Sequence, residues 1–241
     1  MSISVQPTMP ADHEIEPNGH TYRLSGDQYR RTIEASIIPE AEGVELRDGF
    51  LVQEGSHYPL SLAQYRTMAD HEILTTDDRI ELLEGWLVAK MTKHPRHEIA
   101  KGLTHDRLTA LTPAGWFLVV ESPTDTADSE PEPDLMVVRG ARRDYFEGAP
   151  GAGDVALVVE VADSSLLGDR SRKKRLYARA GYPIYWLINL VQDRIEVYTD
   201  PSGPIDQPDY LHRQDFGPDE MIPLVIAGRE VGRLAVREML P

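Results

Sequence analysis

The chain has 241 residues, 41% of them hydrophobic, which is enough for one large domain or for one domain with an extension. It carries no cysteine, which excludes disulfides, zinc–thiolate sites and cysteine nucleophiles, and its formal net charge of −15 argues against non-specific coating of nucleic acid. No apolar run approaches the ~18 residues of a membrane span, and the first residues lack the basic and apolar parts of a signal peptide. We therefore expect no membrane partner and a cytoplasmic location.

The first part of the chain contains an arm and an internal repeat. Residues 1–20 are polar and contain three prolines, which predicts a disordered or loosely packed arm. Residues 24–52 align without a gap with residues 60–88, a shift of 36 (60 − 24), with repeated identities and matched apolar positions. Each copy predicts a helix with a serine N-cap, followed by a β-hairpin. The caps are Ser25 and Ser61, and the hairpin turns are Asp48-Gly49 and Glu84-Gly85.

This repeat suggests how the chain is divided. We expect residues 21–56 to be an extra copy of the helix–hairpin unit and residues 57–241 to form the main domain, which includes the second copy. Two repeats are too few for a solenoid. The extra copy would extend the sheet, cap an edge or support a dimer contact.

A segment with two histidines follows the repeat. Pro95 stands at the expected start of a helix that continues from Glu98 to Leu111. His94 and His97 would serve either as metal ligands or, as we prefer, as helix-entry side chains or phosphate contacts. A strand at residues 116–121 and an acidic loop at residues 122–132 come next.

Two apolar runs in the middle of the chain each carry one acid. Asp134 opens the run at residues 133–138, and Glu160 closes the run at residues 154–161. Runs of this length, bounded by Gly and Pro, predict strands buried on both faces. A buried carboxylate is unfavourable unless it is paired, and Mg²⁺ is a suitable partner because one or two carboxylates usually hold it. The structural alternatives are a turn cap for Asp134 and an ion pair with Lys173 for Glu160.

A basic helix is expected after the second acid. Asp169, Lys173 and Tyr177 stand at i, i+4 and i+8, so a helix would place them along one face, and Gly181 would end it. Residues 170–179 hold six bases and no acid, which predicts either a local basic surface or a solvated helix face. Two strand-borne acids and a helix lysine would then converge on one point.

The last part of the chain predicts further strands. Residues 184–189 and 194–198 predict a hairpin. Short apolar runs at residues 221–226 and 231–234 are expected to be edge strands that finish the sheet. For three aromatic residues we expect core packing with a satisfied polar tip, namely Tyr177, Tyr185 and Trp186.

At the positions of these acids and of the basic helix, the sequence resembles the Uma2 family of endonucleases, which belongs to the PD-(D/E)xK nuclease superfamily. The resemblance rests on Pro133-Asp134, on Glu160 and on the block from Asp169 to Leu187, and it covers residues 60–240. It implies a mixed α/β fold: an α+β restriction-endonuclease-like core, with a mixed sheet flanked by helices, preceded by the duplicated helix–hairpin unit.

The same resemblance implies the site residues. Asp134 and Glu160 would form a metal site. The usual lysine of the superfamily stands two residues after the second acid, where this chain has Ala162. In Uma2-like sequences the lysine comes from the following helix, and Lys173 occupies that place. Supporting roles would fall to Glu81, His97 and Asp169.

The resemblance implies a metal-dependent endonuclease that hydrolyses phosphodiester bonds in DNA, with Mg²⁺ or Mn²⁺ as cofactor. It also implies a possible homodimer, because nucleases of the superfamily often cut two strands with two active sites. Lys173 would orient the attacking water or stabilise developing negative charge. Two alternatives stay open: a catalytically inactive nuclease fold that acts as a binding or assembly module, and a metal-dependent hydrolase of small phosphorylated molecules. Backbone phosphates of the nucleic acid would be bound by Arg170, Arg172, Lys174 and Arg175.

Overall fold

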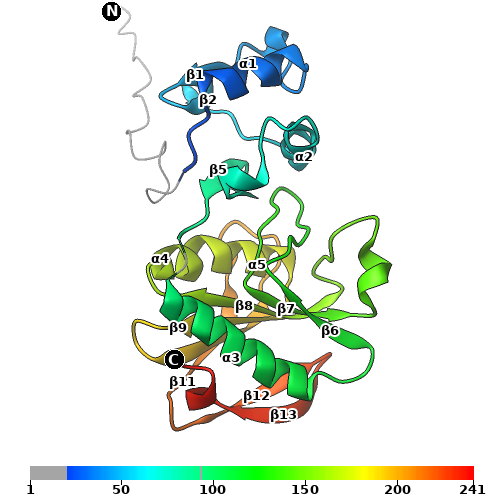
Figure 1. Cartoon of the computed structure of the whole chain (residues 1–241), viewed down its shortest axis with the longest axis vertical. Helices are drawn as coiled ribbons and strands as arrows, with labels where there is room; N and C mark the ends of the chain where they lie inside the picture. Colours follow the sequence, from blue (N-terminus) through cyan, green and yellow to red (C-terminus); the bar gives the residue numbers. More distant parts are fainter. Residues whose placement is uncertain (1–20, 93) are drawn as a thin grey trace, which may run out of the picture. The chain divides into compact units, whose positions relative to one another are not determined.

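The computed structural model describes residues 21–92 and 94–241, and packing divides the chain into two compact units, one ending at Lys90 and one beginning at Met91 (Figure 1). Each unit has a hydrophobic core of its own. The arm expected at residues 1–20 lies outside the described residues. The boundary expected between residues 56 and 57 falls within the first unit, which holds both copies of the repeat, and the division into functional parts stays a prediction.

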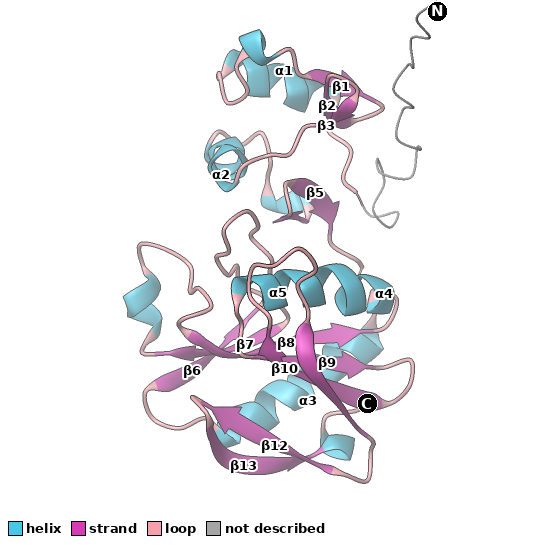
Figure 2. Cartoon of the chain, turned by 180° about the vertical axis from the view of Figure 1, so that it is seen from behind, coloured by secondary structure: helices cyan, strands magenta, loops and turns pink. Residues whose placement is uncertain are grey.

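The first unit consists of two copies of a helix followed by a hairpin, as the repeat predicts (Figure 2). The first copy contains α1 (Gly26–Glu34), the 3-10 turn η2 (Glu40–Glu42), β1 (Glu45–Arg47) and β2 (Phe50–Gln53), and the short strand β3 (Ser56–His57) pairs with β2. The second copy contains α2 (Leu62–Asp70), η3 (Thr76–Asp78), β4 (Ile80–Leu83) and β5 (Trp86–Ala89).

Both helices of this unit begin where the sequence predicts, because each N-cap serine belongs to a capping box. The hydroxyl of Ser25 accepts a hydrogen bond from the N–H of Gln28, whose side chain accepts one from the N–H of Ser25. Ser61 and Gln64 repeat this arrangement in the second copy. The reciprocal bonds satisfy two backbone donors at each helix start, which fixes that end of the helix.

Both hairpins turn at the predicted residues, which have left-handed backbone angles. The φ angle is 49° at Asp48 and 87° at Gly49, and it is 53° at Glu84 and 79° at Gly85. Two consecutive positive φ angles are typical of the two-residue hairpin loop whose twist matches the flanking strands. The acid–glycine pairs therefore determine where each hairpin reverses.

The second unit is built on a six-stranded sheet in the order β11-β10-β9-β8-β7-β6. The strands β8 and β9 are parallel, and the other neighbours are antiparallel. β8, the predicted strand that carries Glu160, is buried along its whole length. The six strands are β6 (Trp116–Val120), β7 (Leu135–Arg139), β8 (Val155–Ala162), β9 (Ile184–Asn189), β10 (Arg194–Pro201) and β11 (Tyr210–Phe216).

Helices cover both faces of this sheet (Figures 1 and 2). α3 (Pro95–Leu111) packs on the face to which β9 contributes Trp186 and Ile188. Tyr185, between these two residues, points to the opposite face and contacts Tyr177 of α5. That opposite face is covered by the connection from β8 to β9, which consists of α4 (Leu166–Gly168), the π-helical turn η5 (Asp169–Lys173) and α5 (Lys174–Ala180). Two 3-10 turns complete the unit, η4 (Arg142–Tyr145) and η6 (Val236–Glu238).

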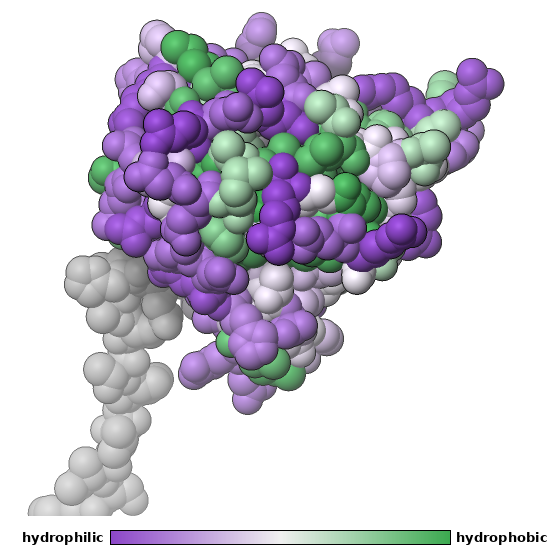
Figure 3. All heavy atoms as spheres, turned by 90° about the horizontal axis from the view of Figure 1, so that it is seen from below, coloured by the Kyte–Doolittle hydropathy of each residue, from purple (hydrophilic) through white to green (hydrophobic). Residues whose placement is uncertain are grey.

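The C-terminal strands do not finish the main sheet, so that expectation is wrong. β12 (Met221–Ile226) and β13 (Arg229–Ala235) form a two-stranded sheet of their own. Ile222, Leu224 and Ile226 alternate along β12 and are buried in the core beside α3, so the hairpin lays its apolar side on the face of the main sheet. Seen from the side on which this hairpin lies, the surface shows apolar residues between polar ones (Figure 3).

The predicted basic helix is present, but part of it is wound as a π-helix. In η5 the N–H of Lys174 bonds to the carbonyl of Asp169, five residues earlier. Such turns insert an extra residue into an α-helix and are frequent at functional sites. The helix ends at Gly181, as expected, with a left-handed φ of 84°.

Candidate active site

The two acids singled out in the sequence lie at the paired strands β7 and β8 of the second unit. β7 and β8 are antiparallel, and Leu135 is opposite Val159. Asp134 comes directly before β7 and Glu160 comes directly after Val159 in β8, so the pairing of the two strands brings the acids close together. Each residue is only 4% exposed. The tertiary structure therefore brings together the two acids that the sequence singles out.

Asp134 is held by a backbone amide and by a histidine. Its Oδ2 accepts a hydrogen bond from the N–H of Val161 at 2.8 Å and lies 3.1 Å from Nε2 of His97. His97 is buried in the first turn of α3. His94, the other histidine of this segment, is the exposed N-cap residue of α3. Of the two histidines considered from the sequence, the structure thus places His97 at the acid.

Glu160 contacts a lysine and a tyrosine of the helical connection. The Nζ of Lys173 lies 2.9 Å from Oε1 of Glu160, and the hydroxyl of Tyr177 donates a hydrogen bond to the same oxygen at 2.8 Å. Lys173 comes from η5 and Tyr177 from α5, four residues later. The i, i+4 spacing therefore does place both side chains on one point, even though the helix contains a π-helical turn.

Tyr177 is a site neighbour to which sequence reasoning gave only a packing role. Its ring does pack, edge-on to Tyr182 and tilted against Tyr185. Its hydroxyl nevertheless reaches Glu160. The spacing of four residues from Lys173 already placed Tyr177 on the same helix face as the lysine, but only the packing of that helix on the sheet brings its hydroxyl to Glu160.

In this chain Ala162 occupies the strand position, two residues after Glu160, where the superfamily usually has its lysine. Ala162 is fully buried at the last position of β8, where it is paired with Asn189 of β9. Lys173 approaches Glu160 from the helical connection instead. That Lys173 takes the role of the superfamily's lysine stays a prediction.

A second group of charged residues lies next to His97. Lys101 of α3 is 2.7 Å from Oε2 of Glu98 and is also ion-paired with Glu121, which follows β6. Oε1 of Glu98 lies 3.4 Å from Nδ1 of His97. Sequence reasoning gave no site role to this group, although the i, i+3 spacing of Glu98 and Lys101 on one helix was a signal for it.

The four basic residues expected to contact phosphates differ in their surroundings. Arg170 forms a bidentate ion pair with Glu196 of β10, and Lys174 lies 2.7 Å from Asp209. Arg172 is buried, whereas Arg175 is exposed. Their contact with nucleic acid stays a prediction.

Glu196, which is fully buried, anchors a polar cluster beneath the basic helix. It accepts hydrogen bonds from Arg170, from the hydroxyl of Tyr198 at 2.6 Å and from Asn189 at 2.8 Å. Burial by itself would raise the pKa of this carboxyl, but these hydrogen bonds, with the charge of Arg213, hold the pKa below its ordinary value. The cluster therefore keeps Glu196 ionised and ties Arg170 to the sheet.

Two further residues have predicted supporting roles. Glu81 is buried on β4 of the first unit, where it is paired with Val88. Asp169 is buried at the start of η5, and its carbonyl accepts a hydrogen bond from the hydroxyl of Tyr185 at 3.2 Å. The supporting roles of Glu81 and Asp169 stay predictions.

The donor set of the candidate site suits a hard divalent cation. Within residues 21–92 and 94–241, no group of three or more His, Asp or Glu side chains gathers as metal ligands. Asp134 and Glu160 supply two buried carboxylates. Mg²⁺ is usually bound by one or two carboxylates and completes its shell with waters and substrate phosphates.

Comparison with known proteins places the chain in a family. The model of Uma2, described as "Putative restriction endonuclease", matches residues 62–236. A solved structure of "a putative nuclease belonging to DUF820" from Anabaena variabilis resembles the chain with a TM-score of 0.56 and 16% identity, over 75% of this chain and 97% of the other. No curated protein matches the sequence significantly. Among the described residues, no helix has the length and apolar character needed to cross a membrane. The Uma2 model matches more than half of this chain, and the chain has an α+β nuclease fold. Together these findings show that the chain belongs to the Uma2 family.

Proposed function

We propose that this protein is a metal-dependent endonuclease that hydrolyses phosphodiester bonds in DNA. The observation that carries the proposal is the pair of buried acids Asp134, directly before β7, and Glu160 on the adjacent strand β8. Asp134 accepts the N–H of Val161, the residue after Glu160, and Lys173 lies 2.9 Å from Glu160. Membership of a family described as "Putative restriction endonuclease" supports the same class of reaction.

Asp134 and Glu160 would hold the metal ion, Mg²⁺ or Mn²⁺. Two neighbouring carboxylates repel each other, and a divalent cation between them would relieve that repulsion. When bound, such an ion polarises a phosphoryl oxygen and lowers the pKa of an attacking water.

The surrounding residues would hold these carboxylates in place before substrate arrives. The N–H of Val161 and the ring of His97 fix one oxygen of Asp134, and the hydroxyl of Tyr177 fixes one oxygen of Glu160. Lys173 would orient the water or stabilise negative charge on the phosphoryl group. Supporting acids in this proposal are Glu81 and Asp169.

The DNA backbone would lie against the basic helix. Arg175 is exposed there, while Arg170 and Lys174 would exchange their present carboxylate partners for phosphates, with Arg172 close by in the chain. Binding through phosphates weakens steeply with added salt, which gives this part of the proposal its own readout. The homodimer expected from the superfamily remains part of the proposal.

The test is cleavage of supercoiled plasmid, linear duplex, single-stranded and branched DNA, with Mg²⁺ or Mn²⁺ and against EDTA. We expect metal-dependent nicking by the wild type and a loss of about 10²-fold or more in Asp134→Ala, Glu160→Ala and Lys173→Ala. Arg233→Ala is the matched control, because it removes an exposed cation paired with Glu230 on β13. Nicking that survives in the three site variants would contradict the proposal.

A catalytically inactive nuclease fold that serves as a binding or assembly module is the second candidate. The cluster of Glu160, Lys173 and Tyr177 favours it, since a closed group of hydrogen bonds can stabilise a core without any reaction. Titration calorimetry with Mg²⁺ separates the two functions. If the protein is an endonuclease, the wild type should bind Mg²⁺, and Asp134→Asn and Glu160→Gln should each abolish that binding. If it is an inactive module, neither the wild type nor the two variants should bind Mg²⁺.

A further inference from the structure

The two copies in the first unit are related by a constant shift in sequence. Adding 36 to a residue number in the first copy (residues 21–53) gives the equivalent residue of the second copy (residues 57–89). Under this rule α1, η2 and β2 coincide residue for residue with α2, η3 and β5. The copies are therefore two instances of one structural unit.

The backbones of the two copies pair reciprocally. The N–H of Tyr22, which precedes the first helix, bonds to the carbonyl of Leu87 in the second hairpin at 2.8 Å. The equivalent N–H of Tyr58 bonds to the carbonyl of Leu51 in the first hairpin at 2.9 Å. In each copy, the segment that precedes the helix thus bonds to the hairpin of the other copy.

Side chains repeat the same exchange. The Nε2 of Gln28 donates to the carbonyl of Ile73, and the Nε2 of Gln64 donates to the carbonyl of Ile37, each at 3.1 Å. The hydroxyl of Tyr22 bonds to Asp78, and that of Tyr58 bonds to the equivalent acid of the first copy, Glu42. In an isologous interface, residue i of one partner contacts j of the other, and j contacts i. These bonds have that property.

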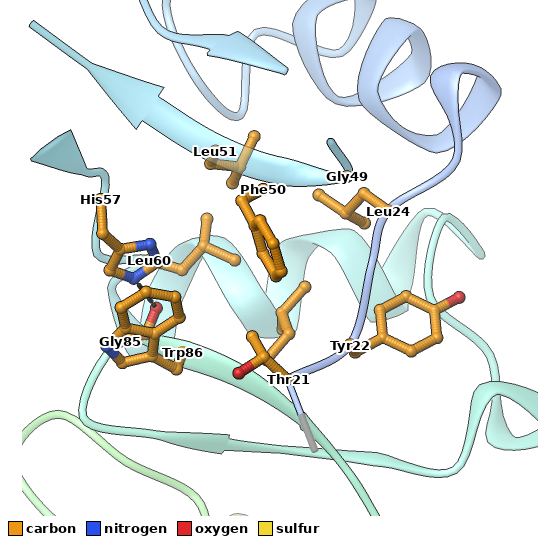
Figure 4. A pocket seen from close by; sticks show the side chains of 11 residues that line it. Thr21, Tyr22, Leu24, Gly49, Phe50, Leu51, His57, Leu60, Gly85 and Trp86 are labelled. Atoms are coloured by element: carbon orange, nitrogen blue, oxygen red, sulfur yellow. Dashed lines mark hydrogen bonds between the residues drawn. The ribbon is translucent and has the colours of Figure 1, made fainter. Parts of the chain in front are cut away.

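The hydrophobic core is also shared. Phe50 and Trp86 are equivalent residues, and their rings lie edge to face, with centroids 6.5 Å apart, in the lining of a pocket formed by both copies (Figure 4). A residue that touches its own equivalent lies near a twofold axis. One cluster of buried residues unites equivalent positions of both copies: Leu24 and Leu60, Ile37 and Ile73, Val44 and Ile80, Leu51 and Leu87.

We propose that the helix–hairpin unit of the second copy carries a self-complementary docking face for a unit of its own kind, and that the first copy occupies this face within the same chain. The second copy from residue 62 onward belongs to the part that the family model matches, and the first copy lies outside it. A chain with one copy would present the face to a second chain. Here the face is closed, and a homodimer of the full chain would use another surface.

Cysteine cross-linking tests this arrangement in the full chain, which has no native cysteine. Thr21 and Val88 are partners in an antiparallel bridge between the copies. Opposite residues of this kind have Cα atoms about 4.5–5.5 Å apart, within the range of a disulfide. We expect the Thr21→Cys/Val88→Cys variant to oxidise to a cross-linked monomer on a non-reducing gel, while the two single variants stay uncrosslinked.

A disulfide between two chains, or two free thiols in the folded variant, would overturn the proposal. If the cysteine variant does not fold, two single substitutions that remove side-chain hydrogen bonds to the other copy, Gln28→Ala and Gln64→Ala, test the same arrangement. We expect Gln28→Ala to speed hydrogen exchange at residues 71–75 of the second copy, and Gln64→Ala to speed it at residues 35–39 of the first. Both effects should be unchanged by dilution of about a hundredfold, since pairing within one chain does not depend on concentration. Effects confined to the substituted copy, or protection lost on dilution, would contradict pairing within the chain.

Discussion

At the scale of single residues, donors from different elements hold the two central carboxylates. Asp134 receives a backbone N–H from β8 and faces a histidine of α3. Glu160 accepts hydrogen bonds from the ammonium group of Lys173 in η5 and from the hydroxyl of Tyr177 in α5. Removing one such donor leaves a buried charge with fewer partners, which lowers the stability of the fold as well as the order of the site.

Substituting Tyr177→Phe should therefore destabilise the second unit while keeping its packing. The ring would still contact Tyr182 and Tyr185, but Glu160 would lose the hydroxyl at 2.8 Å. A hydrogen bond to a charged group contributes about 1.5–3 kcal/mol, so we expect a loss of that size in urea denaturation. Tyr145→Phe is the control, because its hydroxyl bonds to a carbonyl at an exposed site and its loss should cost at most about 1 kcal/mol. Equal losses in the two variants would contradict the role assigned to Tyr177.

His57 gives the first unit a pH dependence. Its ring stacks on Trp86 with centroids 3.3 Å apart, and burial lowers its pKa from 6.5 to about 4. Between these values the unfolded chain binds the proton and the folded chain does not, so the free energy of unfolding falls as the pH decreases across this interval. The stability of His57→Phe, which keeps a ring on Trp86 but cannot titrate, should decline less. Urea midpoints of both proteins at the two ends of the interval check this, and parallel declines would refute it.

At the scale of elements, the hairpin turns of the first unit fix how each hairpin meets the segment that precedes its helix. The carbonyl of Gly49 accepts the N–H of Leu24, and the carbonyl of Gly85 accepts the N–H of Leu60. These contacts bring the glycines close to the chain. A Cβ on either glycine would lie 2.6 Å from the Cβ of Arg23 or of Pro59.

This geometry predicts unequal effects for three glycine-to-alanine substitutions at positive φ. Gly49→Ala and Gly85→Ala should each destabilise by about 1–2 kcal/mol from the left-handed backbone. The steric overlap adds about 1–3 kcal/mol to that loss. Gly55→Ala has a similar φ of 84° with nothing near its Cβ, so it should show the backbone effect alone. Chemical denaturation of the three variants measures the loss of unfolding free energy in each. A loss in Gly55→Ala as large as in the other two would show that the neighbours of Gly49 and Gly85 shift to relieve the steric overlap.

At the scale of the whole molecule, the family domain and the compact units do not have the same boundaries. The family match begins at residue 62, whereas the first unit extends to Lys90. The second copy therefore belongs to the family domain by sequence and to the first unit by packing, because it shares a core with the first copy. We therefore expect the stability of the second copy to depend on contact with a partner of its own kind.

Deleting residues 1–56 should accordingly produce self-association. The truncated chain would expose Leu60, Ile73, Ile80 and Leu87, which are buried in the shared core. Apolar area of this kind is removed from water most readily by a second copy of the same face. We expect a discrete dimer by light scattering after gel filtration, against the unchanged mass of a full-length Gly55→Ala control. A folded monomer would show that the second copy needs no partner.

The candidate site could be predicted in part. The sequence identifies Asp134, Glu160 and Lys173, because a single acid in an apolar run and a lysine at helical spacing are local patterns. It did not identify Tyr177 as a contact of Glu160, nor the group formed by Glu98, Lys101 and Glu121. The contacts of Tyr177 with Glu160 and of Lys101 with Glu121 join residues that are far apart in the chain, and they arise only once the strands and helices have packed.

The sequence by itself determined the capped helices, the two hairpins, the buried strands with their acids, and the Uma2 family with its α+β nuclease fold. These features depend on neighbours a few residues away, or on a motif that survives as a pattern. Only the tertiary structure decided that the C-terminal hairpin lies on the face of the sheet, that Arg170 is tied to Glu196, and that the two copies exchange contacts. The physical reason is that burial and pairing are properties of the assembled surfaces, and several partners satisfy the same local pattern until packing selects one.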